Sequence, residues 1–134
     1  MSVLSRKQKK HIDMLFYHEH QLREAVGELR AAVVADAADS ADPTAKEAVA
    51  MLADLPDLMG YKDPETWLRV MDLTWKRYHD HHHIGIVMRA RYQRKESPQR
   101  TSIENHIVEG TYWLWRDEFL TYAAMMAVMN GIIL

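Results

Sequence analysis

Residues 97–131 read SPQRTSIENHIVEGTYWLWRDEFLTYAAMMAVMNG and contain the clearest helix start and stop signals of the chain. Ser97-Pro98 is a helix-start signal, because serine caps a helix N-terminus and proline is tolerated in the first turn. It predicts a short helix that ends near Ile107. A tight turn and a longer helix over 111–129 follow, and Asn130-Gly131 supplies the stop. This order is typical of a helix-turn-helix.

Two more helices are predicted upstream of this stretch. Asp63-Pro64 repeats the start signal, and side chains at helical spacing follow it on one face: Trp67, Val70, Met71, Thr74 and Tyr78. After a His-rich stretch, a second apolar stripe predicts another helix: Ile84, Val87, Met88 and Tyr92. Gly85 weakens the first turn of that helix. Residues 61–134 are therefore expected to form an all-α helix-turn-helix domain.

One long helix is predicted from Arg6 to Val34, because apolar side chains recur there at spacings of three, four and seven: Ile12, Leu15, Leu22, Val26, Leu29 and Val33. The spacing is a heptad seam, which Glu19 interrupts. The helix either packs on its own domain or forms a dimerising coiled coil. Both interpretations stay open.

A small, acidic linker is expected over residues 35–41, before Asp42-Pro43 opens another helix that runs out by Pro56. Gly60 marks a break. The chain is accordingly divided into a helical oligomerisation or partner region, residues 1–60, and the helix-turn-helix domain, residues 61–134.

Composition narrows the class of protein. Hydrophobic residues make up 48% of the 134 residues, while five Gly and four Pro leave most of the length available for helix. The absence of cysteine excludes a disulfide scaffold and a thiolate zinc site. No segment approaches a membrane span or a signal core, so a cytoplasmic protein without a membrane partner is expected. Without a nucleophile elbow, phosphate loop or zinc-protease motif, neither an enzyme nor a cofactor is expected.

Charge is unevenly distributed, although the net charge of the chain is only −2. Residues 76–100 hold seven Lys and Arg against two Asp and Glu, a net charge of +5, whereas residues 1–60 carry −3. Affinity for DNA phosphates would come from the cations of this stretch and of the last predicted helix: Arg89, Arg91, Arg94, Lys95, Arg100 and Arg116. The alternative is an ordinary solvated helix face.

The partner-facing surface of the last helix follows from helical phase. Tyr112, Trp115 and Phe119 should face the core, which leaves an apolar and acidic surface outside: Glu109, Gly110, Trp113, Leu114 and Asp117. Glutamate can accept a hydrogen bond from cytosine and leucine can touch a thymine methyl. Exposure of a ring as large as that of Trp113 often marks contact with a partner.

Several runs carry a family resemblance: Trp67-Leu68-Arg69-Val70, Arg91-Tyr92, Arg100-Thr101, Ile107, residues 111–120, Tyr122-Ala123-Ala124 and Gly131-Ile132-Ile133. With them, the C-terminal half resembles the RinA/ArpU-type transcriptional regulators of phages and prophages in Gram-positive bacteria. The resemblance implies a domain similar to the fourth region of sigma factors, sequence-specific binding to double-stranded DNA at late or lysis promoters, and RNA polymerase as a possible partner. Thr101 and Thr111 complete the predicted DNA-binding residues, which are Arg89, Arg91, Arg94, Lys95, Arg100, Thr101, Glu109, Gly110, Thr111, Trp113, Leu114 and Arg116. A homo-oligomer is expected, with a dimer favoured.

This chain departs from the family pattern on the second helix of the motif. The family usually has Ser, a basic residue and Arg where this chain has Val108, Glu109 and Leu114. Two alternatives therefore stay open: a protein-interaction module that docks on RNA polymerase or a regulator through Trp113 and Leu114, and a DNA-packaging component similar to small terminase subunits.

The histidine run suggests a metal hypothesis. His79 and His83 are four residues apart and could share one helix face as imidazole ligands. A structural zinc site needs four ligands, and no cysteine or acidic cluster completes the set. The simpler interpretation is a polar helix start that is sensitive to pH near neutrality.

Overall fold

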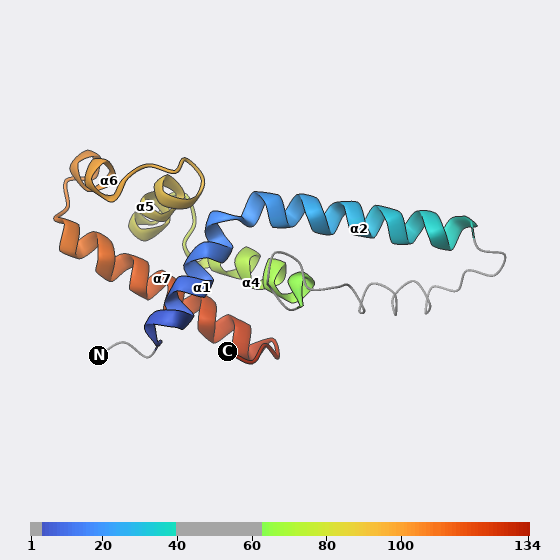
Figure 1. The fold of residues 1–134 in the computed structure, drawn as a ribbon. Helices are drawn as coiled ribbons and strands as arrows, with labels where there is room; N and C mark the ends of the chain where they lie inside the picture. Colours follow the sequence, from blue (N-terminus) through green and yellow to red (C-terminus); the bar gives the residue numbers. More distant parts are fainter. Residues whose placement is uncertain (1–3, 40–62) are drawn as a thin grey trace. The chain divides into compact units, whose positions relative to one another are not determined.

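A computed structural model describes residues 4–39 and 63–134, and these form helices without a strand (Figure 1). The helices are α1 (Arg6–Tyr17), α2 (Glu19–Asp39), α4 (Pro64–Arg77), α5 (His83–Tyr92), α6 (Pro98–Glu104) and α7 (Glu109–Met129). The predicted all-α class is confirmed for this part of the chain. None of these helices is long and apolar enough to cross a membrane. The helix expected from Asp42-Pro43 lies outside the described residues.

The prediction of one uninterrupted helix from Arg6 to Val34 is wrong. Ser5 caps α1 with a reciprocal capping box to Gln8, and α1 ends at Tyr17. His18 leaves the helical conformation with φ −104° and ψ 17°, and α2 begins at the next residue. At the other end, α2 continues to Asp39, into the expected linker, because alanine is the strongest helix former and fills this segment.

The described residues fall into two compact units. Residues 4–18 and 66–134 form the first, which we call the headpiece unit; residues 19–39 and 63–65 belong to the second. The packing thus differs from the division predicted at residue 60, since α1 contacts α5 and α7. In the second unit, Arg30 binds the Glu65 carboxylate through both of its oxygens.

An aromatic cluster forms the centre of the headpiece unit. Phe16 of α1 lies 4.8 Å from Phe119 of α7, between ring centroids, and Trp75 of α4 lies 5.0 Å from the same phenylalanine ring. Tyr92 of α5 stacks on Phe119 at 5.7 Å. The predicted core face of α4 is confirmed, since all of its members are buried: Trp67, Val70, Met71, Thr74 and Tyr78. Four helices, α1 among them, therefore share one core.

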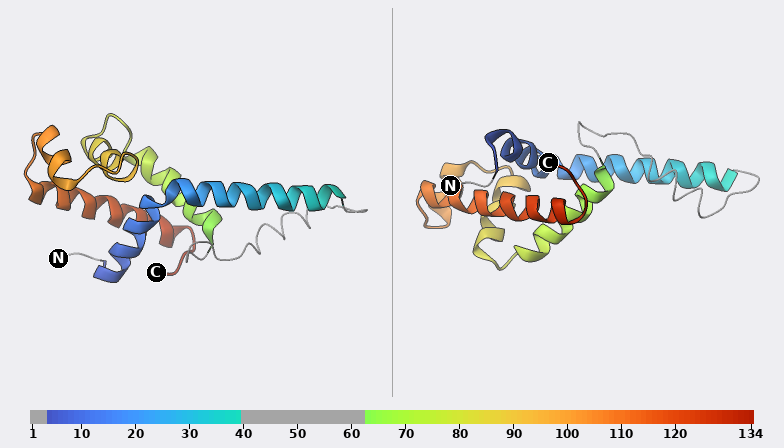
Figure 2. Two further views of the ribbon diagram at one scale, coloured as in Figure 1. Left: turned by 45° about the horizontal axis from the view of Figure 1, so that its top comes forward. Right: turned by 90° about the horizontal axis from the view of Figure 1, so that it is seen from below.

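The last two helices have the order expected of a helix-turn-helix. Ser97 caps α6 by accepting a hydrogen bond from the Arg100 N–H at 3.1 Å. α6 packs on α5 and α7 and stays beside the start of α7 in the further views (Figure 2). It ends at Glu104, before the expected Ile107, and α7 starts at Glu109, two residues before the expected Thr111. Residues 105–108 are thus the turn, and Gly110 belongs to the first turn of α7.

Gly85 has a packing role that the sequence did not indicate. A Cβ atom at this position would lie 2.1 Å from the carbonyl oxygen of His79 and 2.5 Å from that of Tyr78. Only glycine admits such a close approach of two backbones. The first turn of α5 therefore packs directly on the end of the α4 region.

Candidate nucleic-acid interface

The first turns of α7 carry an open face opposite the buried one. Tyr112, Phe119 and Leu120 are fully buried, whereas Leu114 is 69% exposed. Gly110 lies one turn before Leu114, and a Cβ added to it would have no neighbour within 4 Å. The prediction that α7 turns Gly110 and Leu114 outward is therefore confirmed.

Exposed apolar side chains continue from this face onto α6 and the turn. Ile103 is 76% exposed and Val108 is 70% exposed. Trp113 retains 36% of its surface, and its ring packs beside Tyr112 at 5.0 Å and under the Arg116 guanidinium at 4.6 Å. Trp113 is thus only partly exposed and is held in place by its neighbours.

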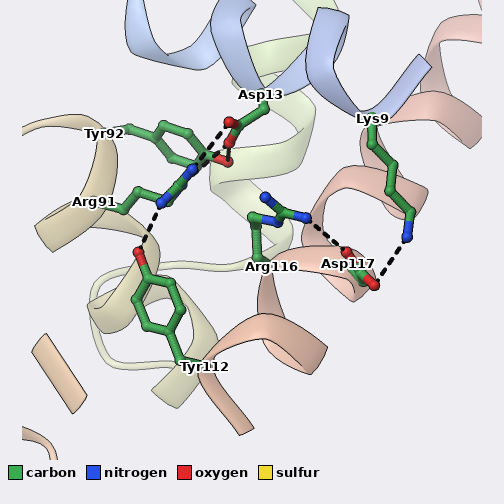
Figure 3. A network of polar contacts seen from close by, with 7 residues as sticks. All are labelled: Lys9, Asp13, Arg91, Tyr92, Tyr112, Arg116 and Asp117. Atoms are coloured by element: carbon green, nitrogen blue, oxygen red, sulfur yellow. Dashed lines mark hydrogen bonds and ion pairs between the residues drawn. The ribbon is translucent and has the colours of Figure 1, made fainter. Parts of the chain in front are cut away.

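The acidic residues farther along α7 are engaged within the headpiece unit. Asp117 accepts from Lys9 of α1 at 3.0 Å and from Arg116 at 3.3 Å (Figure 3). Glu118 accepts from the Tyr78 hydroxyl at 3.5 Å, and burial, followed by the charge of Glu118, raises the pKa of Tyr78 to about 12. The carboxylate of Asp117 is therefore compensated by two cations.

The prediction that Arg91 contacts a partner is wrong. Arg91 is 6% exposed, and its guanidinium donates to both carboxylate oxygens of Asp13, at 3.1 and 2.9 Å, and to the Tyr112 hydroxyl at 3.1 Å (Figure 3). Tyr92 donates to the same carboxylate at 2.6 Å. Burial alone would lower the pKa of Arg91, but the hydrogen bonds and charge of Asp13 outweigh it and raise that pKa. Arg91 is a structural link between α1, α5 and α7.

Three more predicted site residues are tied to the fold. The Arg89 guanidinium lies 4.6 Å from the centre of the Trp75 ring, and the Arg116 guanidinium is shared between Trp113 and Asp117. In both arginines, Nε is buried and has no hydrogen-bond partner among the described residues. Thr101 is fully buried, so its predicted contact with DNA is wrong. Thr111, in the first turn of α7, is half-buried.

The exposed predicted cations lie around the start of α6. Arg94 donates to Glu96 at 3.4 Å, and Arg100 donates to Glu104, one turn later, at 2.9 Å. Lys95 contacts the backbone carbonyl of Tyr17 and lies over the ring of that tyrosine. All three cations are exposed to solvent. Glu109 and Gly110, also predicted to contact DNA, are exposed as well.

Sequence reasoning missed the cations of α1. Arg6, Lys7 and Lys10 are exposed on a helix that packs against α7. With them, the headpiece unit holds 13 Lys and Arg against eight Asp and Glu, a formal net charge of +5. Residues 19–65 hold four against 11, a net charge of −7. The basic run near the N-terminus was visible in the sequence, but its position beside the last helix was not.

The predicted shared helix face of His79 and His83 is wrong. α5 begins at His83, and His79 lies in the turn before it. His82 caps α5 instead, since its Nδ1 accepts from the Ile84 N–H at 3.1 Å, and its ring stacks on His83 with centroids 4.5 Å apart. Among the described residues, no three His, Asp or Glu side chains gather in a way that could hold a metal ion.

No family model, curated protein or solved structure matches the chain. The resemblance to the RinA/ArpU-type regulators therefore stays a prediction.

Proposed function

We propose that this chain is a sequence-specific, DNA-binding transcription regulator of the phage type and that α7 is its recognition helix. The observation that carries the proposal is a short helix, α6, followed by a four-residue turn and the longer α7, within a unit of net charge +5. In proteins of this kind, the second helix of the motif lies in the major groove and its first turns contact base edges.

The charge of the headpiece unit fits a polyanionic partner. Non-specific affinity for DNA is mainly electrostatic, because Lys and Arg release the counterions condensed on the phosphates. Arg94 and Arg100 flank the start of α6, and Arg6, Lys7 and Lys10 lie on α1 beside α7. These are the residues to which we assign phosphate contact.

The packing supplies the rigidity that base reading requires. α7 is fixed by the aromatic cluster around Phe119, by the contact between Tyr112 and Arg91, and by the ion pair between Asp117 and Lys9. In its first turns, by contrast, Leu114 is exposed and Gly110 has open space around it. A firmly held helix with an open end is suited to entering a groove.

The test is binding of the full chain to DNA across a salt series. Sites are first selected from a random duplex library, and the dissociation constant is then measured for wild type and for Arg94→Ala and Arg100→Ala. We expect each substitution to weaken binding about equally on all sequences and to reduce the salt slope by about one. Arg69→Ala, which removes an exposed cation of α4, is the matched control and should change neither. Absence of binding at low salt refutes the proposal.

A second candidate function is favoured by the exposed apolar side chains at Ile103, Val108 and Leu114. An interaction module would use them, with Trp113, to dock on RNA polymerase or a regulator. In that case, replacing Trp113 and Leu114 by Ala abolishes the protein complex and leaves DNA affinity nearly unchanged.

We also propose that the regulator acts as a dimer that reads two half-sites about one helical turn, or a multiple of it, apart. The heptad seam is a poor candidate for the contact, because Leu22 and Val26 are fully buried in the single chain and Leu29 is half-buried. Sedimentation of the free protein and of its DNA complex tests the proposal, and a monomer bound to a single half-site contradicts it.

A further inference from the structure

Leu114 lies near the start of α7, the part of a recognition helix that contacts base edges. It lies in the second turn of α7, one turn after Gly110, on the side away from the buried Tyr112, Phe119 and Leu120. It is 69% exposed. Gly110 adds no side chain beside it and has open space around its Cα. The backbone of α7 can therefore approach a ligand closely at this point.

The chemistry of this position selects among the bases. Leucine neither donates nor accepts a hydrogen bond, so it cannot recognise the polar edges of guanine, cytosine or adenine. Thymine is the base that presents an apolar group, its C5 methyl, in the major groove. Resting on the proposed DNA-binding function, we infer that Leu114 makes recognition depend on the methyl group of a thymine.

Charge favours DNA over a protein as the occupant of this face. The headpiece unit carries a net charge of +5, and Lys9 and Arg116 compensate the carboxylate of Asp117, one turn beyond Leu114. Arg100 is exposed on α6, the helix that precedes the turn into α7. Within a unit of net positive charge, an apolar contact on this helix suits a thymine methyl in the major groove.

The experiment removes the methyl from the DNA. Starting from a selected duplex, each thymine is replaced singly by deoxyuridine, and the dissociation constants of wild type and Leu114→Ala are measured at one salt concentration. For wild type, we expect at least one replacement to weaken binding about fourfold, the factor that follows from burying one methyl-sized group. For Leu114→Ala, the same replacement should have no effect, while the variant binds the thymine duplex more weakly than wild type does.

A matched control keeps the result specific. Met125→Ala truncates an exposed apolar side chain of the same helix, three turns after Leu114, and should retain the wild-type response to deoxyuridine. Circular dichroism checks that each variant is folded.

Each remaining outcome refutes one of the two claims. Sequence-selective binding that is insensitive to every deoxyuridine, or that stays sensitive in Leu114→Ala, overturns the inference and leaves the proposed function standing. Unchanged DNA affinity of Leu114→Ala, together with loss of a protein complex, overturns it in favour of the interaction module. Absence of DNA binding by wild type refutes the proposed function itself.

Discussion

Substitution of Asp13 by Asn tests whether Arg91 belongs to the fold or to the surface. In wild type, the Asp13 carboxylate receives two hydrogen bonds from Arg91 and one from Tyr92, and Arg91 also donates to Tyr112. Asparagine has nearly the same shape but no charge, and only one of its two terminal atoms can accept a hydrogen bond. The variant therefore leaves the buried guanidinium without its counter-charge.

The expected cost follows from burial. Removing one partner of a buried ion pair typically costs about 3–5 kcal/mol, because the remaining charge is uncompensated. Both side chains of this pair are largely inaccessible, since only 8% of the Arg91 side chain and 12% of the Asp13 side chain are exposed. The amide oxygen of the Asp13→Asn variant can still accept a hydrogen bond, so we expect a loss of about 3 kcal/mol in the free energy of unfolding. That is a large part of the roughly 5–15 kcal/mol that stabilises an ordinary domain.

The assay is urea unfolding followed by tryptophan fluorescence and far-ultraviolet circular dichroism. The control is Glu104→Gln, the same carboxylate-to-amide change in the exposed pair with Arg100, and it should leave the unfolding midpoint essentially unchanged. If Asp13→Asn costs no more than Glu104→Gln, the buried ion pair between Asp13 and Arg91 does not stabilise the fold, which refutes the structural role of Arg91.

Three further predictions concern local structure. Gly85→Ala should lower the unfolding midpoint strongly or prevent folding, since its methyl group would overlap the Tyr78 carbonyl; an unchanged midpoint contradicts the packing of α5. Ser97→Ala should cost about 1 kcal/mol by removing the cap of α6, measured by urea unfolding against Ser97→Asp, which keeps a cap. Burial, followed by the charge of neighbouring His83, lowers the pKa of His82 below its ordinary value of 6.5. The neutral His82 imidazole therefore contributes its full stabilisation above about pH 6.5, and this stabilisation is lost as the pH falls through the pKa of the folded state. His82→Asn, which keeps a capping acceptor, should lose less stability than wild type between about pH 7.5 and about pH 5.5, and equal losses contradict the role of the cap.

The helices of the C-terminal half were predictable because their signals are local. Pro64 and Ser97-Pro98 begin helices where expected, and α7 ends at Met129, with Gly131 beyond it at φ +90°. Caps and proline act within one turn, so neighbouring residues carry the information. The break at His18 was not predictable from spacing, because apolar periodicity continues across it from Leu15 to Leu22.

The prediction for Arg91 was wrong because its partner is distant in the sequence. Asp13 and Arg91 are 78 residues apart, and nothing in the local sequence distinguishes Arg91 from the exposed Arg94. An arginine is rarely buried unless it is paired, so exposure was the reasonable expectation. Asp13 reaches Arg91 only because α1 packs on α5 and α7, and local sequence carries no sign of that packing.

The contacts of α1 with α5 and α7 change which cations are candidates for DNA binding. The +5 of residues 76–100 overstates the surface charge there, because Arg91 is neutralised by Asp13 and Arg89 lies over Trp75. The headpiece unit nevertheless keeps a net charge of +5, since α1 contributes four cations against the single carboxylate of Asp13. DNA phosphates attract whichever cations the fold leaves exposed, irrespective of their place in the sequence. Candidate phosphate contacts are therefore to be sought on α1 and around the start of α6, and base contacts on the first turns of α7.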